Sequence, residues 1–221
     1  MKFQFLFLAL FLSGIPGTEN IRFSSDDKKE SIGEWEVVQD SEGVQTSVRW
    51  IETGKGIKTH ERKGEMIINC SVDDITGILT DAKSSACWMR NVEESFDLER
   101  VNQSEWYTYT VFNIPWPFEN RDLVSYMTMK TNSENRNTNI SIVSMEDYIP
   151  CKSRITRLTD YMANWSIVRI NYSRIRITFT AISGSPPTVP RWIQDPVVEN
   201  IFHGNLINLK AYILSNKKSN S

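Results

Sequence analysis

The chain has 221 residues, a formal net charge of −2 and 40% hydrophobic residues. This length and composition are those of one globular domain with a sizeable core. The slightly acidic balance argues against nucleic acid as the main partner, because phosphate binding depends on clustered lysine and arginine. The two histidines, His60 and His203, have no cysteine or carboxylate at a metal-ligand spacing, so neither a metal site nor a cofactor is predicted.

Residues 1–17 have the pattern of a secretory signal peptide. Lys2 precedes an apolar run over residues 3–12 that a single glutamine interrupts, and small residues up to Gly17 suit a cleavage point. The run is shorter than the ~20 residues that span a bilayer. We therefore expect an exported protein, periplasmic or secreted.

The domain itself is expected over residues 34–214. A polar linker or a short helix is expected before it, at residues 18–33, and a polar tail after it, at residues 215–221. Alternating β-branched and aromatic residues bounded by turn residues predict its strands. The predicted strands are 35–38, 44–52, 57–70, 92–101, 105–114, 122–131, 138–147, 161–171 and 173–182.

Two features inside these predicted elements are specific. Gly64 interrupts the third strand and is interpreted as a bulge. Ser71 suits the N-cap of a helix that runs to about Lys83, because acidic residues follow in its first turn and an apolar stripe continues at helical spacing. A second short helix is expected around Cys87.

The last predicted helix begins near Val189 or Pro190, since proline is well tolerated in a first turn. Its apolar stripe is wide, so one face should be deeply buried. The stripe contains Ile193, Val197, Val198, Ile201, Phe202, Leu206, Leu209 and Ile213. Strands, a helical pair, more strands and a terminal helix make an α+β order, as in an antiparallel sheet that grips one helix.

The three cysteines, Cys70, Cys87 and Cys151, are odd in number and fit no zinc or redox spacing. In an oxidising compartment, one disulfide and one buried thiol would account for them. Three separate buried thiols are an equal alternative, and the sequence does not decide between the two.

A proline-rich corner separates two of the predicted strands. Pro115 and Pro117 each lack the donor that a regular strand needs, so the segment predicts a rigid turn that carries Trp116. Arg121 and Asp122 follow where the second strand begins. We interpret this charged pair as structural, pinning the corner to neighbouring backbone. Trp116 and the two prolines are interpreted as structural too, and a transient membrane contact of an exposed Trp116 is the alternative.

This corner resembles the Trp-Pro-x-x-x-Arg-Asp element of the START (StAR-related lipid-transfer) domain, here Trp116, Pro117, Arg121 and Asp122. Trp165 stands where that family has a strand tryptophan, and residues 190–193 resemble the entry to its terminal helix. The resemblance covers roughly residues 34–214. It implies a helix-grip fold, in which a curved antiparallel sheet wraps around a long C-terminal α-helix and encloses a hydrophobic cavity.

No catalytic motif accompanies this resemblance. The chain has no G-x-S-x-G element, metal-ligand cluster or phosphate-binding glycine loop, so we predict that it is not an enzyme. Strand alternation and the family's pocket positions, which lie on the strands beside the corner and on the terminal helix, predict the ligand-binding residues. They are Trp88, Thr108, Thr110, Phe112, Ser125, Met127, Met129, Trp165, Val198, Phe202 and Leu206. For each single residue, a plain core position is the alternative.

Some lipid-binding members of the family carry a buried acid–arginine pair on these two strands. Counting along the motif places Thr108 and Met127 at those positions, so the pair is absent here. The expected pocket has few polar anchors and suits a sterol-like, isoprenoid or acyl compound. The predicted function is binding, and transfer, of such a hydrophobic small molecule or lipid. The alternatives are a non-enzymatic interaction module with a filled cavity and a cyclase- or hydrolase-like helix-grip enzyme.

Overall fold

The computed structural model describes residues 30–114, 119–185, 187 and 189–219. The predicted signal peptide, most of the expected linker and the corner residues Pro115, Trp116 and Pro117 lie outside these described residues. Within them the chain forms the strands β1 (Glu30–Ser31), β2 (Glu36–Ser41), β3 (Val44–Glu52), β4 (Lys58–Ile68), β5 (Val92–Asn102), β6 (Glu105–Phe112), β7 (Arg121–Thr131), β8 (Thr138–Ser144), β9 (Thr156–Arg157), β10 (Tyr161–Arg169) and β11 (Ile175–Ser183). The helices are α1 (Val72–Thr80), η2 (Ala82–Ser84), α2 (Ser85–Trp88) and α3 (Arg191–Ser219).

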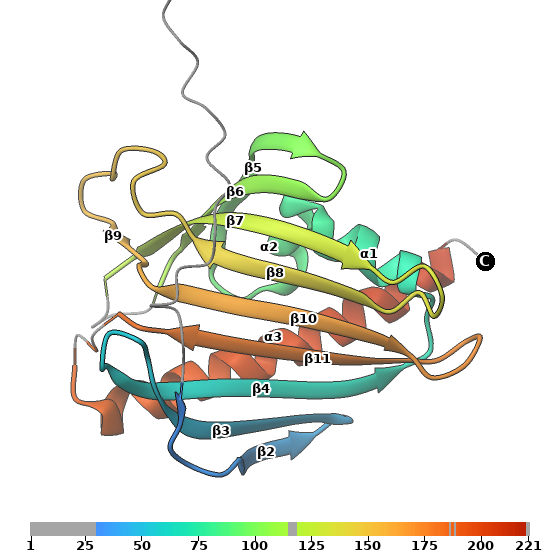
Figure 1. The fold of residues 1–221 in the computed structure, drawn as a ribbon, viewed down its shortest axis with the longest axis horizontal. Coiled ribbons are helices and arrows are strands. Elements are labelled where there is room, and N and C mark those ends of the chain that lie inside the picture. The colour runs from blue at the N-terminus through green and yellow to red at the C-terminus, as the bar shows by residue number, and fades with distance from the viewer. Residues whose placement is uncertain (1–29, 115–118, 186, 188, 220–221) are drawn as a thin grey trace, which may run out of the picture.

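The strands form one curved sheet in the order β1-β3-β4-β11-β10-β8-β7-β6-β5, to which β2 adds through β3 and β9 through β7. All pairs are antiparallel except β7 with β9. Helix α3 runs along one face of this sheet, and α1 and α2 lie on the same side near β5, β6 and β7 (Figure 1). The α+β class and the helix-grip architecture predicted from the sequence are confirmed.

Three elements differ from expectation. Glu30 and Ser31, in the stretch expected to be a linker or a short helix, pair with β3 as strand β1. Strand β9 has only two residues, too few to produce an alternating pattern in the sequence. Helix α3 continues to Ser219, into the expected polar tail, because no glycine or proline follows Gly204 to end it.

The bulge predicted at Gly64 is wrong. The register of β4 continues unbroken on both sides of this residue, which pairs with Thr46 on β3 and Phe179 on β11. A Cβ atom at position 64 would lie 2.0 Å from Cδ1 of Leu206. The glycine therefore lets the α3 helix seat directly on the sheet.

The main core fills the space between the sheet and its helices. Ile75 on α1 and Leu209 on α3 have no exposed surface, and Leu206 and Ile213 are almost fully buried. Ile193, expected in the same stripe, is 36% exposed instead. The predicted N-cap is confirmed: Ser71 and Asp74 exchange side chain to backbone hydrogen bonds of 3.1 and 3.0 Å in a capping box.

His203 ties α3 to the edge of the sheet. Its Nε2 lies 2.8 Å from the Ser41 hydroxyl on β2, and its Nδ1 lies 3.2 Å from the Thr46 hydroxyl on β3. Burial lowers the pKa of this imidazole. His203 is therefore a satisfied core histidine at neutral pH rather than a free titrating group.

We expect Gly64→Val to destabilise the protein by about 1–3 kcal/mol, because the new side chain meets Leu206 and must push α3 off the sheet. The matched control is Gly77→Ala in α1, where nothing lies within 4 Å of an added Cβ. That change should stabilise by about 0.5–1 kcal/mol, through helix propensity alone. Urea unfolding measures both, and a neutral Gly64→Val would show that the close approach is not required.

Candidate ligand-binding cavity

A cavity of about 380 Å³ lies between the sheet and α3. Strands β4, β6, β7, β10 and β11 contribute its wall on the sheet side, and α2 and α3 contribute the opposite wall. Its lining is mostly apolar. This volume falls in the lower part of the roughly 300–1,000 Å³ range of small-molecule sites, so the space suits one ligand of modest size.

Ten of the eleven residues predicted to bind a ligand line this cavity. They are Trp88, Thr108, Thr110, Phe112, Ser125, Met127, Trp165, Val198, Phe202 and Leu206. Met129 is the exception. It lies on the predicted face of β7 but two residues beyond Met127, where it packs against the main core instead. That the other ten contact a ligand remains a prediction.

Strand alternation places the cavity wall as predicted. On β6, Trp106, Thr108, Thr110 and Phe112 line the cavity, whereas Tyr109 and the other alternate residues face the opposite side of the sheet. The wall then continues across the sheet as stacked aromatic rings. Their centroids are 4.0 Å apart between Trp165 and Phe179, and 5.6 Å apart between Phe179 and Phe202.

Thr108 and Met127, the two positions counted from the family motif, lie in contact in the structure. The Thr108 hydroxyl lies 3.0 Å from the Ser125 hydroxyl and 3.8 Å from Sδ of Met127, and all three residues are buried. The two positions expected to have lost a charged pair are therefore neighbours on the wall. Thr108 makes only weak polar contacts with Met127 and Ser125 at this point.

Arg121 and Asp122 separate to opposite faces of the sheet. Arg121 lines the cavity, and the structural role expected for it remains a prediction. Asp122 is 1% exposed on the other face, where Arg157 donates to both of its carboxylate oxygens at 2.7 and 3.0 Å. The Tyr109 hydroxyl also donates to Asp122, at 3.0 Å.

Arg157 in turn holds the chain that covers this outer face. Its guanidinium donates to the backbone carbonyls of Glu146, Ile149 and Pro150 at 2.8, 3.2 and 3.4 Å. The hydrogen bonds that Arg157 donates to Asp122 raise the pKa of Arg157, so this guanidinium stays charged. The expectation that the motif pins neighbouring backbone is correct for Asp122, which acts through Arg157.

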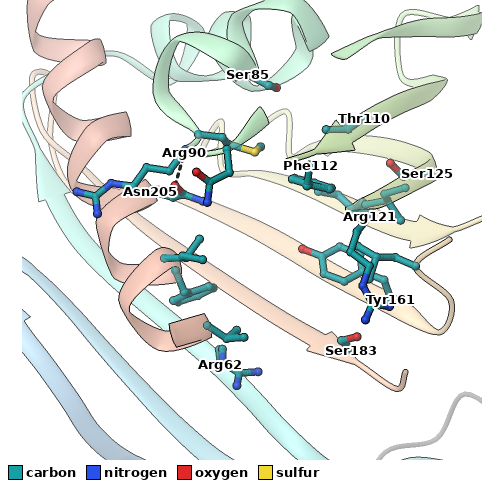
Figure 2. A pocket seen from close by; sticks show the side chains of 18 of the residues that line it. Arg62, Ser85, Arg90, Thr110, Phe112, Arg121, Ser125, Tyr161, Ser183 and Asn205 are labelled. Atoms are coloured by element: carbon teal, nitrogen blue, oxygen red, sulfur yellow. Dashed lines mark hydrogen bonds between the residues drawn. The ribbon is translucent and has the colours of Figure 1, made fainter. Parts of the chain in front are cut away.

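The charged side chains of the cavity lining are not predicted from the sequence. Arg62, Arg121, Arg191 and Asp195 line the cavity, so the expectation of few polar anchors is wrong. Figure 2 shows Arg121, Tyr161 and Ser183 at one side of the cavity and Arg62 near its base. Two signals in the sequence point to this part. Arg62 lies on the same strand face as Gly64, where α3 seats, and Asp195 lies on the apolar stripe of α3.

Arg90 and Asn205 bound the cavity beside α3 (Figure 2). The backbone N–H of Arg90 donates to Oδ1 of Asn205 at 2.8 Å. This bond ties the turn after α2 to the middle of α3. Asn91 follows in the left-handed region, with φ of 64°, which a turn at this place requires.

None of the three cysteines forms a disulfide, and Cys70 is buried whereas Cys87 and Cys151 are exposed. In the described part of the chain, no group of three histidine, cysteine, aspartate or glutamate side chains is placed to hold a metal ion. The described helices include none with the length and apolar character needed to cross a membrane.

A curved antiparallel sheet that grips one long helix and keeps a mostly apolar cavity beneath it defines a helix-grip protein. A solved STAR-related lipid transfer protein of Xanthomonas axonopodis (fragment 25–204) has this fold, with a TM-score of 0.71 and 26% identity over 81% of this chain and 98% of its own. The chain is a START-like domain.

Other comparisons agree on the fold. Human STARD10 superposes with a TM-score of 0.69 and 18% identity, over 83% of this chain and 74% of its own. Human StAR-related lipid transfer protein 5 superposes with a TM-score of 0.70 and 14% identity, over 85% of this chain and 89% of its own. By sequence, an uncharacterised protein of Pseudomonas aeruginosa is 22% identical over 166 residues, which are 75% of this chain and 79% of its own. A scan against protein-family models finds no match.

We expect Asp122→Ala to destabilise the protein by about 3–5 kcal/mol, because it leaves the guanidinium of Arg157 buried and unpaired. The control is Asp73→Ala, which breaks an ion pair with Arg136 whose side chains are 78% and 57% exposed. That loss should stay below about 1 kcal/mol. Urea unfolding distinguishes the two, and equal small losses would contradict a structural role for Asp122.

Proposed function

We propose that this protein binds one hydrophobic molecule, a lipid or a lipid-like compound, in the cavity beneath α3, and carries or buffers it across an aqueous space. The observation that supports this proposal is the mostly apolar cavity itself, on a START-like fold. The lipid transfer named for the Xanthomonas axonopodis protein is consistent with it.

The driving force would be removal of apolar ligand surface from water, about 25 cal/mol for each Å² buried. Phe112, Met127, Phe179 and Phe202 would supply the apolar contacts. Methionine adapts to irregular shapes, so Met127 suits a flexible ligand. Because α3 forms one wall of the cavity, release would require this helix or the turns beside it to move.

The residues that line the cavity favour a lipid carrier over the alternative of an enzyme. The described lining residues include no cysteine, histidine or lysine, so acid–base or nucleophilic catalysis would have to depend on Asp195 or Tyr161. The other alternative, a module whose cavity is filled by side chains, is less consistent with about 380 Å³ of space.

We also propose that the protein acts outside the cytoplasm, in a periplasm or after secretion, on the basis of the signal-like residues 1–17. The mass of the mature protein from its own host tests this part. A mature form that retains these residues would overturn it.

The function is tested by native mass spectrometry of protein purified from its own host, followed by solvent extraction. We expect an extra mass that extracts as one lipid class. A thermal-shift panel of lipids provides an independent check, since a ligand that binds only the folded state raises the melting temperature. An apo mass that total membrane lipids leave unchanged would overturn the proposal.

We expect Phe202→Glu to reduce lipid uptake by about tenfold or more, because it places a carboxylate against the Phe179 ring inside the cavity. Circular dichroism should still report a folded protein. Leu214→Glu is the control: it introduces the same charge on the same helix, at a residue 38% exposed and outside the cavity. Unchanged uptake by Phe202→Glu would contradict the assignment of the cavity.

A further inference from the structure

The charge of the cavity is opposite to that of the chain. Its described lining residues include four arginines and one carboxylate, whereas the whole chain has a net charge of −2. The arginines are Arg62, Arg90, Arg121 and Arg191, and the carboxylate is Asp195. A cleft with low-dielectric walls and charge of one sign concentrates ions of the other sign.

Three of these arginines lie toward one end of the sheet. Strands β4, β7 and β10 run in the same direction, and β11 runs opposite to them. Arg62 on β4, Arg121 at the start of β7, Tyr161 at the start of β10 and Ser183 at the end of β11 are therefore brought to this end (Figure 2). The first turns of α3 add Arg191 and Asp195.

The polar groups at this end are buried without full hydrogen bonding. Arg62 is 9% exposed, and its Nε has no hydrogen-bond partner among the described residues. Its Nη2 lies 3.7 Å from Oδ1 of Asp195, and Nδ1 of His60 lies 3.5 Å from Oδ2. Oδ1 of Asp195 and Nδ1 of His60 are likewise buried without a hydrogen-bond partner in the described chain, and Nη1 of Arg191 lies 3.8 Å from that Oδ1. Such groups carry a desolvation cost that a bound polar group would offset.

The contrast with Asp122 and Arg157 shows that the fold can satisfy such a pair. There, the same two residue types meet at 2.7 and 3.0 Å, and the remaining donors reach backbone carbonyls. At the cavity, Arg62 and Asp195 stay farther apart than a hydrogen bond allows. The first pair is complete by itself, whereas the second has donor capacity left over.

The surrounding groups favour an anion. Burial lowers the pKa of His60, so this imidazole is neutral at pH 7. Glu199, one turn beyond Asp195, also faces Arg62, but burial raises its pKa and so disfavours its charged form. Burial raises the pKa of the Tyr161 hydroxyl to about 12, which keeps it a neutral donor. At this end three arginines, Arg62, Arg121 and Arg191, outnumber the two carboxylates of Asp195 and Glu199.

We propose that the cavity binds an amphipathic lipid whose headgroup is an anionic carboxylate or phosphate, and that Arg62 binds this headgroup while the apolar body lies against the aromatic wall. This inference rests on the proposed function and specifies its ligand class. Planar guanidinium groups suit carboxylate and phosphate oxygens because they offer paired donors. Arg121 and Arg191 add positive charge to the lining of the same cavity.

The test compares ligands with the same oleyl chain and different heads: oleate, 1-oleoyl lysophosphatidate and uncharged oleyl alcohol. Calorimetric titration of the full chain should give affinities for the two anionic lipids about tenfold or more above that for the alcohol. Arg62→Met should remove this preference and leave binding of the alcohol within about twofold, since methionine fills a similar space. Arg62→Lys should retain part of it. Acetate and inorganic phosphate alone should bind far more weakly than the lipids.

The outcomes separate this inference from the proposed function. Equal affinity of the unchanged protein for oleate and oleyl alcohol would overturn the anionic headgroup and leave lipid binding intact. Failure of all three lipids to bind would overturn both. Acetate or phosphate binding as tightly as the lipids would assign the site to a free anion. An equal loss of affinity for oleate and for oleyl alcohol in Arg62→Met would show that Arg62 has a structural role only. If that variant does not fold, the comparison of the three lipids in the unchanged protein still decides.

Discussion

The width of the sheet is the constraint on which the rest of this structure depends. Nine strands follow one another at a spacing of about 4.8 Å, whereas a helix with its side chains is only about 10–12 Å across. Helix α3 can therefore cover only part of the face that the curved sheet presents. Gly64 fixes where it makes its closest approach, and α1 and α2 fill one flank. The cavity is the apolar space that remains.

Local periodicity predicted much of this arrangement and failed where distance along the chain matters. Alternation assigned the faces of β6 and β7 correctly. It could not show that Met129, although it lies on the predicted face of β7, is outside the cavity. Asp195 interrupts an apolar stripe visible in the sequence, whereas Arg62 lies in a polar run. Their meeting, however, depends on how a strand and a helix more than a hundred residues apart pack together, and no period encodes that. Gly64 was misassigned for the same reason.

The two buried arginine–aspartate pairs differ in how completely they are hydrogen-bonded, and this difference separates a stabilising pair from a candidate binding site. Arg157 and Asp122 are hydrogen-bonded to each other, and Arg157 also donates to backbone carbonyls, so these bonds offset the cost of their desolvation. Arg62 and Asp195 are nearly as buried but incompletely bonded, which is a condition that proteins maintain mainly at binding and catalytic sites. The number of charges in each pair is the same. Only the geometry separates a structural pair from a candidate recognition site.

The opposite orientation of Arg121 and Asp122 also bears on how the chain finds its fold. Successive residues of a strand face opposite sides, so a shift of β7 by one position would exchange these two side chains. The carboxylate would enter the cavity, and the guanidinium would enter the apolar cluster around Tyr109 and Val124. Arg157 would then face a like charge. This dipeptide therefore penalises the nearest competing alignment of β7, and so it adds to the specificity of strand pairing as well as to the stability of the finished structure.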